Sequence, residues 1–259
     1  MKLSVIIPVY NEERFIGSVI EKVRSVTLPP CLTRELIVVN DGSTDNTAKI
    51  LERFKGFPEV KILHHARNLG KSAAVRTGIQ TAQGDLILIQ DADLECTPAD
   101  YPRLLEPFLG NHLSVVYGSR FKGKIKNMSL MNRIANRIST ATVNLLFRTK
   151  LSDVNTCYKV FRRKLLDRNK ITSKHFVFDA EITVKLLKQG YQILEVPISY
   201  CGRSRSEGKK MNWLHALRVY WGIFKYRFVE AETASPGFFL NSHARRSNPD
   251  SAEALLLDG

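Results

Sequence analysis

The chain has 259 residues, of which 44% are hydrophobic and 25% charged, so it can bury a substantial core, and whole-chain disorder and fibrous architectures are excluded. The formal net charge is +14, and residues 1–229 hold 37 basic and 20 acidic side chains, so the excess lies in the body of the chain. Such a charge indicates an anionic partner: nucleic acid, an anionic membrane surface or a phosphorylated ligand.

Apolar runs alternate with helical patterns through the first half of the chain. Buried strands are predicted at residues 3–9, 35–39, 60–64, 86–89 and 113–117. Helices are predicted between them, at residues 12–26, up to about 54, 70–82 and 98–109. Continuous apolar strands separated by helices are typical of a mostly parallel sheet with helices on both faces. The predicted fold class is therefore α/β, and binding residues are expected in the loops that follow the strands.

The second half of the chain is less regular. Helices are predicted at residues 127–147, 179–189 and 212–229, an extended segment at 153–161 and a strand at 192–197. The last helix has a narrow polar stripe of His215, Arg218, Gly222 and Lys225, and nearly all its other residues are aromatic or aliphatic. This pattern predicts an amphipathic helix that either lies at a membrane interface or packs on the domain core. The expected parts are a domain at 1–210, this helix at 211–230 and a flexible tail at 231–259.

The four cysteines lie far apart and show no metal-binding spacing: Cys31, Cys96, Cys157 and Cys201. At this density they predict reduced thiols and no disulfide framework, as in a cytoplasmic protein. The apolar run at residues 3–9 is too short for a signal peptide, and no apolar run is long enough to predict a membrane-spanning helix.

Acidic side chains follow the strand predicted at residues 86–89. Asp91, Asp93 and Glu95 alternate along the loop, and at the mouth of a parallel sheet they would repel one another unless a cation joined them. A hard divalent cation takes oxygen ligands, and a substrate phosphate can fill its remaining positions. The cluster indicates a metal site; the alternative is a solvated acidic turn in which Asp93 caps a helix.

Two other predicted strand ends carry candidate binding residues. Asp41 is placed to accept hydrogen bonds from a base or ribose, and Gly42 allows the tight turn into the next helix. Lys71 follows a glycine at a helix start, where amide groups, helix dipole and charge can hold a phosphate; the alternative is a solvated lysine. The P-loop pattern is absent, and no G-x-G-x-x-G follows the first strand, which argues against a Rossmann dinucleotide site.

These segments, together with SVIIPVYNEE at residues 4–13, resemble the family 2 glycosyltransferases of the GT-A fold. The run GDLILIQDADLECTP at residues 84–98 is similar to the segment that carries the D-x-D motif of that family. The resemblance covers most of residues 1–229 and is sharpest to the branch of dolichyl-phosphate mannose synthases and bacterial polyprenyl-phosphate glycosyltransferases. It implies a GT-A, Rossmann-like nucleotide-sugar-binding fold and an inverting hexosyltransferase that uses Mg²⁺ or Mn²⁺.

The residues and the resemblance together assign roles to individual side chains. The residues expected at the nucleotide sugar are Pro8, Tyr10, Glu12, Val39, Asp41, Lys71, Asp91, Ala92, Asp93, Arg203, Arg205, Lys209 and Lys210. The expected metal ligands are Asp91, Asp93 and Glu95, although the mannose synthases often have Gln at the position of Glu95. Asp93 and Arg120 are the catalytic candidates, with Arg120 holding the acceptor phosphate.

The expected acceptor is a polyprenyl (dolichyl-type) phosphate and the expected donor a GDP- or UDP-hexose, with mannose or glucose as the sugar. The alternative is a family 2 transferase that acts on a hydroxyl of a polysaccharide, glycolipid or protein glycan. A lipid phosphate is already an anionic nucleophile near neutral pH, whereas a hydroxyl acceptor would need a base such as Asp153 or Glu181. The protein is expected to be peripheral at the cytoplasmic face of a membrane, on anionic lipid or a membrane partner protein. Nucleic-acid binding, which the charge alone suggests, would leave the acidic cluster among phosphates and is not expected.

Overall fold

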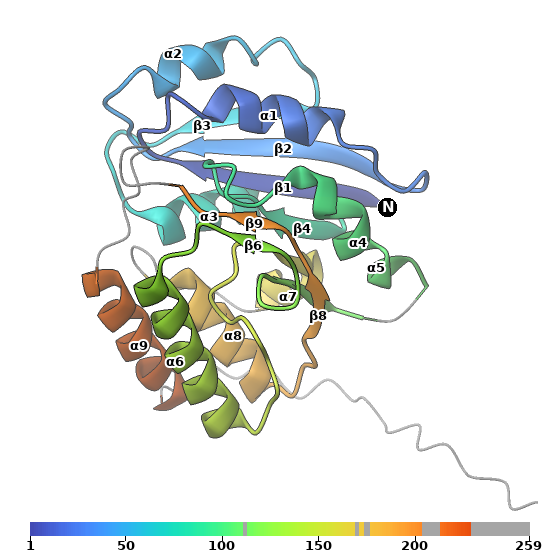
Figure 1. The fold of residues 1–259 in the computed structure, drawn as a ribbon. Coiled ribbons are helices and arrows are strands. Elements are labelled where there is room, and N and C mark those ends of the chain that lie inside the picture. Colours follow the sequence, from blue (N-terminus) through green and yellow to red (C-terminus); the bar gives the residue numbers. More distant parts are fainter. Residues whose placement is uncertain (111–112, 169–170, 174–176, 204–212, 229–259) are drawn as a thin grey trace, which may run out of the picture.

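A computed structural model describes residues 1–110, 113–168, 171–173, 177–203 and 213–228. Its centre is a seven-stranded sheet with the order β3-β2-β1-β4-β7-β5-β8 (Figure 1). The strands are β1 (Lys2–Val9), β2 (Thr33–Asn40), β3 (Val60–His64), β4 (Leu86–Ile89), β5 (Val115–Ser119), β7 (Lys159–Arg162) and β8 (Leu194–Pro197). All neighbouring pairs are parallel except those of β7, which runs antiparallel to both β4 and β5. The prediction of a mostly parallel sheet is confirmed.

Helices cover both faces of this sheet. They are α1 (Ile16–Ser25), α2 (Thr47–Glu52), α3 (Lys71–Thr81), α4 (Tyr101–Leu105), α5 (Pro107–Gly110), α6 (Leu130–Phe147), α7 (Arg163–Arg168), α8 (Phe178–Lys188) and α9 (Trp213–Phe228). Alternate residues of β1 enter two separate cores, because successive side chains of a strand point to opposite faces. Leu3 and Val5 pack with α1 and α4. Ile6 packs on the other face, with α3 and α8.

The predicted helix at residues 98–109 is broken into three short pieces. A 3-10 turn (Pro98–Asp100) leads into α4, and α5 starts afresh at Pro107. The break has a local cause, since Pro107 lacks a backbone N–H and its ring displaces the carbonyl of the preceding turn. The extended segment predicted at 153–161 is also shorter than expected, because only its end forms β7.

The third core ties α6 and α9 to the outer side of α8. Ile223 and Tyr226 of α9 are buried there with Val143 of α6, and α6 and α9 lie side by side in Figure 1. Gly222, placed by the sequence in a polar stripe, is buried, and a Cβ on it would come within 2.4 Å of Val177. Part of α9 therefore packs on the domain, and the predicted stripe is wrong at this glycine. The predicted tail at 231–259 lies outside the described residues.

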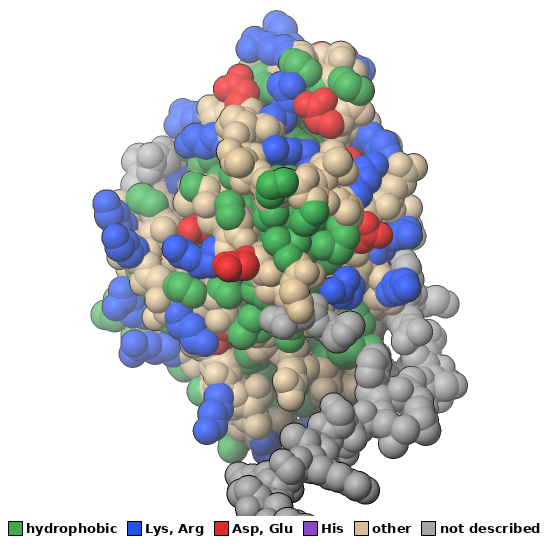
Figure 2. All heavy atoms as spheres, turned by 90° about the vertical axis from the view of Figure 1, so that its right-hand side faces the viewer, with side chains coloured by type: hydrophobic (Ala, Val, Ile, Leu, Met, Phe, Trp, Pro, Cys, Tyr) green, Lys and Arg blue, Asp and Glu red, His purple; other side chains and the backbone are tan. Residues whose placement is uncertain are grey.

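Polar and apolar surfaces are mixed on the outside of the molecule. On the face that carries α5 and β8, Lys and Arg side chains are spread widely and not gathered into one patch (Figure 2). Elsewhere, α6 and α9 expose large apolar side chains, among them Met131, Leu145, Trp221 and Phe228 at 72%, 82%, 72% and 77%. None of the helices in the described part of the chain has the length and apolarity needed to cross a membrane.

Candidate active site

The site residues predicted from the sequence gather at one edge of the sheet. The parallel strands β1, β2, β4 and β5 end there, and β7, which is antiparallel to them, begins there, as the pairing of Ile89 with Lys159 shows. The loops after β4 and β5 therefore face the segment that leads into β7. Below, residues 90–95 are called the acidic loop, and Arg120, Asp153, Asn155 and Thr156 are called the Arg120 cluster.

A buried aspartate, Asp41, lies at the end of β2, beside β1. Pro8 and Val39 are paired across β1 and β2. Asp41 is two residues beyond Val39. Its carboxylate accepts hydrogen bonds from the backbone N–H groups of Leu69 and Gly70 at 2.9 and 2.7 Å and contacts His65 Nδ1 at 2.7 Å. Asp41 thus anchors the loop that leads into α3, a role the sequence did not indicate, and its contact with a base or ribose stays a prediction.

Gly42 is required beside this anchor. Its φ is +68°, and a Cβ would lie 2.4 Å from the carbonyl carbon of Arg67. Only glycine meets both conditions without strain. The turn predicted here is thus a point where two loops approach closely, which a helix cap alone would not require.

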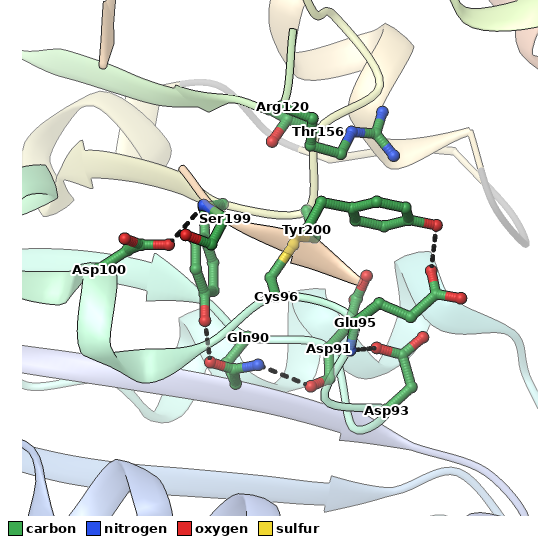
Figure 3. Close-up of a disulfide and its surroundings, with 12 residues drawn as sticks. Gln90, Asp91, Asp93, Glu95, Cys96, Asp100, Arg120, Thr156, Ser199 and Tyr200 are labelled. Atoms are coloured by element: carbon green, nitrogen blue, oxygen red, sulfur yellow. Dashed lines mark hydrogen bonds between the residues drawn. A yellow bond between two sulfur atoms is a disulfide. The ribbon is translucent and has the colours of Figure 1, made fainter. Parts of the chain in front are cut away.

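The acidic loop is fixed at its start by buried hydrogen bonds. Gln90 accepts from the hydroxyls of Tyr101 and Tyr158 at 2.7 and 2.9 Å. Its amide donates to the carbonyl of Asp91 (Figure 3). Farther along, Leu94 has a φ of +57°, which turns the chain. The loop is therefore held in one shape by side chains far away in the sequence.

Glu95 is held by partners outside the acidic loop and shares the Arg203 guanidinium with Asp93, at 4.0 and 3.1 Å. It accepts from Tyr200 Oη at 2.7 Å and from the backbone N–H of Arg203 at 3.0 Å. The described residues contain no group of three side chains placed to hold a metal ion. The three predicted ligands Asp91, Asp93 and Glu95 thus do not form a ready-made set, and Glu95 as a ligand stays a prediction that requires its release from Tyr200.

Asp91 and Asp93 are left with excess negative charge between them. Asp91 pairs with Lys71 Nζ at 2.6 Å. Burial, reinforced by the charges of Asp91 and Glu95 and opposed by Arg203, raises the pKa of Asp93 to about 7. A carboxylate whose neighbours disfavour its charge is a suitable oxygen donor for a divalent cation. These two aspartates therefore fit a metal whose remaining ligands come from a substrate.

Arg203 supplies the cation now present beside the acids. Its guanidinium lies 2.9 Å from Glu12 and 3.1 Å from Asp93. Burial would lower the pKa of Arg203, but Asp93 and Glu12 outweigh that effect and raise it. The prediction put Arg203 at the donor pyrophosphate, and the structure places it at the acids expected to flank that group. Arg205, Lys209 and Lys210 lie outside the described residues.

The Arg120 cluster is closed around a buried ion pair. Arg120 binds the carboxylate of Asp153 through Nε and Nη2, both at 2.7 Å, and Nη2 also donates to the carbonyl of Asn155 at 2.9 Å. Burial would lower the pKa of Arg120, and Asp153 more than offsets it. Thr156 is fully buried, and its hydroxyl has no hydrogen-bond partner among the described residues. An unsatisfied buried hydroxyl beside an arginine suits an anionic ligand.

Both predicted general bases are engaged in structural contacts. Asp153 has a fully buried side chain and is bound by Arg120. Glu181 is also fully buried, and it accepts from Thr172, from Ser173 and from Lys185 at 2.7 to 2.8 Å. Their roles as bases stay predictions, and each would first have to give up these partners.

Sequence reasoning missed a buried pair that joins the two sides of the site. Lys159 is fully buried, donates to the carbonyl of Thr156 and pairs with Asp179 at 2.6 Å. Burial would raise the pKa of Asp179, but Lys159 and Lys71 outweigh it and lower it. Both residues stand in segments whose charged side chains look like ordinary surface residues. Only the position of Lys159 at the start of a strand and that of Asp179 at the start of a helix could have drawn attention.

The prediction of unpaired thiols is wrong for two of the four cysteines. Cys96 and Cys157 form a disulfide, while Cys31 and Cys201 are free and exposed. The bonded pair is separated by 61 residues, and a composition argument about disulfide density carries no information on such a contact. In Figure 3 the bond lies between the acidic loop and the segment that contains Thr156.

Comparisons with known proteins agree with this arrangement. A family model described as glycosyl transferase family 2 matches residues 4–169. Dodecaprenyl-phosphate galacturonate synthase of Rhizobium johnstonii is 26% identical over 93% of this chain and 71% of its own length. Dolichol-phosphate mannosyltransferase of Pyrococcus furiosus is 28% identical over 81% of this chain, which spans 59% of that relative.

Among solved structures, glucosyl-3-phosphoglycerate synthase of Mycobacterium tuberculosis, crystallised with Mn²⁺, UDP and phosphoglyceric acid, has a TM-score of 0.69. It is 18% identical and covers 89% of this chain and 80% of its own. At this identity the likeness concerns the fold, which is that of a glycosyltransferase.

Proposed function

The chain belongs to glycosyl transferase family 2, and from that premise we propose that it moves a hexose, with inversion, from GDP- or UDP-hexose to a polyprenyl phosphate. The names of the two relatives support this acceptor class, since both are polyprenyl- or dolichyl-phosphate sugar transferases. The proposal covers any hexose, either of the two nucleotides and any length of polyprenyl chain.

One observation carries the choice of acceptor. The acidic loop faces two buried groups, Arg120 and the hydroxyl of Thr156, which has no partner among the described residues, and the two predicted bases are engaged elsewhere. The hydrogen bonds of Arg120 with Asp153 and Asn155 use Nε, Nη2 and the backbone N–H, and we propose that Nη1 donates to the ligand. A guanidinium and a hydroxyl, with both predicted bases engaged elsewhere, fit a phosphate nucleophile better than a hydroxyl acceptor.

The residues divide the work of the reaction between them. A divalent cation bound at Asp91 and Asp93 would neutralise the diphosphate as it leaves the sugar. Lys71, whose Nζ is 2.6 Å from Asp91, orients that carboxylate. It also places positive charge where the leaving diphosphate develops negative charge. Arg120 and Thr156 hold the acceptor phosphate so that one of its oxygens attacks the anomeric carbon from the face opposite the leaving group.

For the lipid acceptor, we propose that α6 and α9 bring the protein to a membrane surface. Both helices expose large apolar side chains, and α9 also exposes Arg218 and Lys225. A helix that packs one face on its domain and presents aromatic and basic residues on the other suits the interface of an anionic bilayer. Lys122, Lys124 and Lys126, just before α6, add a second basic segment.

Transfer assays with a matched pair of acceptors test the proposal. Purified protein is given GDP- and UDP-hexoses with Mg²⁺ or Mn²⁺, and either a polyprenyl phosphate or the same polyprenol without phosphate. We expect a glycosyl phosphate from the first acceptor and no product from the second. Equal transfer to the free polyprenol, or activity toward neither lipid but toward a soluble sugar hydroxyl, would show that the acceptor class is wrong.

A further inference from the structure

The disulfide connects the two sides of the candidate active site. Cys96 directly follows Glu95 of the acidic loop, and Cys157 directly follows Thr156 of the Arg120 cluster (Figure 3). Cys96 is 2% exposed, and its backbone forms a bridge with Tyr200, the residue whose hydroxyl binds Glu95. The bond thus lies within one residue of a proposed donor-side acid and of a proposed acceptor-side hydroxyl.

The acidic loop is fastened to the same segment at both of its ends. At its start, Gln90 accepts a hydrogen bond from Tyr158 Oη at 2.9 Å. Just past its end, Cys96 is bonded to Cys157, the residue next to Tyr158. One attachment is a hydrogen bond that no reductant affects, and the other is a covalent bond that a dithiol can open.

We propose that Cys96–Cys157 is a thiol–disulfide site whose state sets how firmly the acidic loop is held against Thr156 and Arg120. Its effect on transfer rests on the function proposed above. With the bond formed, donor and acceptor groups are held in register. With the bond open, the end of the loop stays attached to Tyr200 and Arg203 but loses its covalent attachment to the Arg120 cluster.

The chemistry requires a dithiol reductant. One of its thiolates attacks Sγ of Cys157, the less buried of the two cysteines, and the Cys96 sulfur leaves as a thiolate that takes up a proton. The second thiol then attacks the reductant sulfur in the mixed disulfide and releases Cys157. The protein disulfide gains two electrons and two protons, and the dithiol becomes a cyclic disulfide.

The bond should affect alignment more than donor binding. After reduction, the contacts of Asp91 with Lys71 and of Asp93 with Arg203 remain, because they do not involve the disulfide. We therefore expect the Kd of the nucleoside diphosphate to change less than about twofold. Transfer depends on the position of donor relative to acceptor, and a misplacement of about 1 Å can cost up to about 100-fold in rate. We expect kcat to fall about tenfold.

The first experiment needs no substrate. The full-length protein is oxidised with excess oxidised glutathione or reduced with dithiothreitol, and the Cys96–Cys157 linkage is read by mass spectrometry of peptides. Hydrogen exchange is then followed in residues 91–96. We expect the linked peptide after oxidation and faster exchange of this segment after reduction. If Cys96 and Cys157 both remain free thiols after oxidation, or if exchange is the same in both states, the proposal is overturned whether or not the protein transfers a sugar.

The second experiment uses matched cysteine variants in the transfer assay. Cys96→Ser with Cys157→Ser should have the lower kcat of the reduced protein and no response to dithiothreitol. Cys31→Ser with Cys201→Ser, which removes the two free thiols, should keep the full response. A response that survives in the first variant, or disappears in the second, would assign the effect to another group. If the first variant does not fold, reduction of the unsubstituted protein still gives the kcat comparison.

Discussion

The acidic loop and the Arg120 cluster balance their charges in opposite ways. In the cluster, Arg120 meets a buried carboxylate partner, Asp153, in two hydrogen bonds of 2.7 Å. In the loop, burial and two neighbouring carboxylates raise the pKa of Asp93 to about 7, and Arg203 offsets that only in part. The charge of Arg120 is balanced by Asp153, whereas the acidic loop has excess negative charge.

The difference indicates what each side contributes. A buried and fully paired ion pair fixes geometry, since removing either partner leaves an uncompensated charge. A group of like charges destabilises the folded protein until a ligand of opposite charge binds, so it couples stability to ligand binding. We interpret the Arg120 cluster as a rigid support and the acidic loop as the part that a cation and a diphosphate complete.

The largest expected effect comes from removing the charge of Asp93. Asp93→Asn should lower transfer by about 1000-fold, because the cation that stabilises the leaving diphosphate loses a ligand. The check is kcat/KM at saturating metal, with Glu52→Gln as control, since Glu52 is exposed and pairs only with Lys55 among the described residues. Activity within a few-fold of the unsubstituted protein would remove Asp93 from the site.

The same variant tests the electrostatic side of the comparison. A pKa of about 7 in the folded protein, above the ordinary 3.8, means that Asp93 costs stability as pH rises from about 4 through 7. Asp93→Asn should therefore stabilise the metal-free protein at pH 8 by about 1 kcal/mol or more, and make little difference at pH 4. Urea unfolding at the two pH values measures this, and a destabilised variant at pH 8 would contradict the interpretation.

The opposite result is expected on the other side of the site. Asp153→Ala should destabilise the protein by about 3 kcal/mol, because Arg120 would remain buried without its partner. Urea unfolding at pH 7 is the measurement, and Asp100→Ala, which also removes a largely buried carboxylate but one paired loosely with Arg103 at 3.8 Å, should cost less. If Asp153→Ala were neutral, the cluster would not be the rigid support inferred here.

A smaller effect is expected from a change that keeps the charge of Arg120. Arg120→Lys retains the cation but loses the planar fork that binds Asp153 and faces the acceptor. We expect the KM for polyprenyl phosphate to rise about tenfold while the KM for the nucleotide sugar stays the same. Arg103→Lys, at an exposed position, serves as control. Equal changes for both substrates would argue against an acceptor role.

The smallest effect concerns the membrane surface. Trp221→Ser with Phe228→Ser removes two exposed aromatic side chains and should weaken binding to vesicles containing anionic lipid about fivefold or more at low salt. Stability should be unchanged, because both side chains lie outside the core. Leu109→Ser, at an exposed leucine on α5, is the matched control. Absence of vesicle binding by the unsubstituted protein would refute the surface assigned to α9.

Several strand bounds and the place of the acidic loop could be predicted from local sequence pattern. The strands at residues 60–64 and 86–89 have the predicted bounds, because short apolar runs end at polar or turn-forming residues. The acids after β4 were found by the same logic, since parallel strands end at one edge of a sheet. The prediction of one continuous helix at 98–109 was wrong because it gave no weight to Pro107. The helix-breaking effect of that proline could have been recognised from the sequence.

The Arg120 cluster and the Lys159–Asp179 pair depend on contacts that no local sequence pattern shows. Arg120 and Asp153 are 33 residues apart, and Lys159 and Asp179 are 20 apart. The pairing of β7 between β4 and β5 brings these four residues to the edge where the acidic loop lies. A charged residue in a sequence looks the same whether it is solvated or buried against a partner, so these pairings could not be read in advance.

The length, composition and charge with which the chain was first described thus indicated a folded protein and predicted an anionic partner. An apolar pattern with period and length suited to buried strands, followed by acids at strand ends, was enough for the fold and for the place of the acidic loop at the sheet edge. Only the tertiary structure decided which basic residues are already paired, which hydroxyl has no partner in the described part of the chain, and which two of four cysteines meet. The reason is physical: alternation and capping act over a few residues, whereas burial and charge pairing depend on segments that only folding brings together.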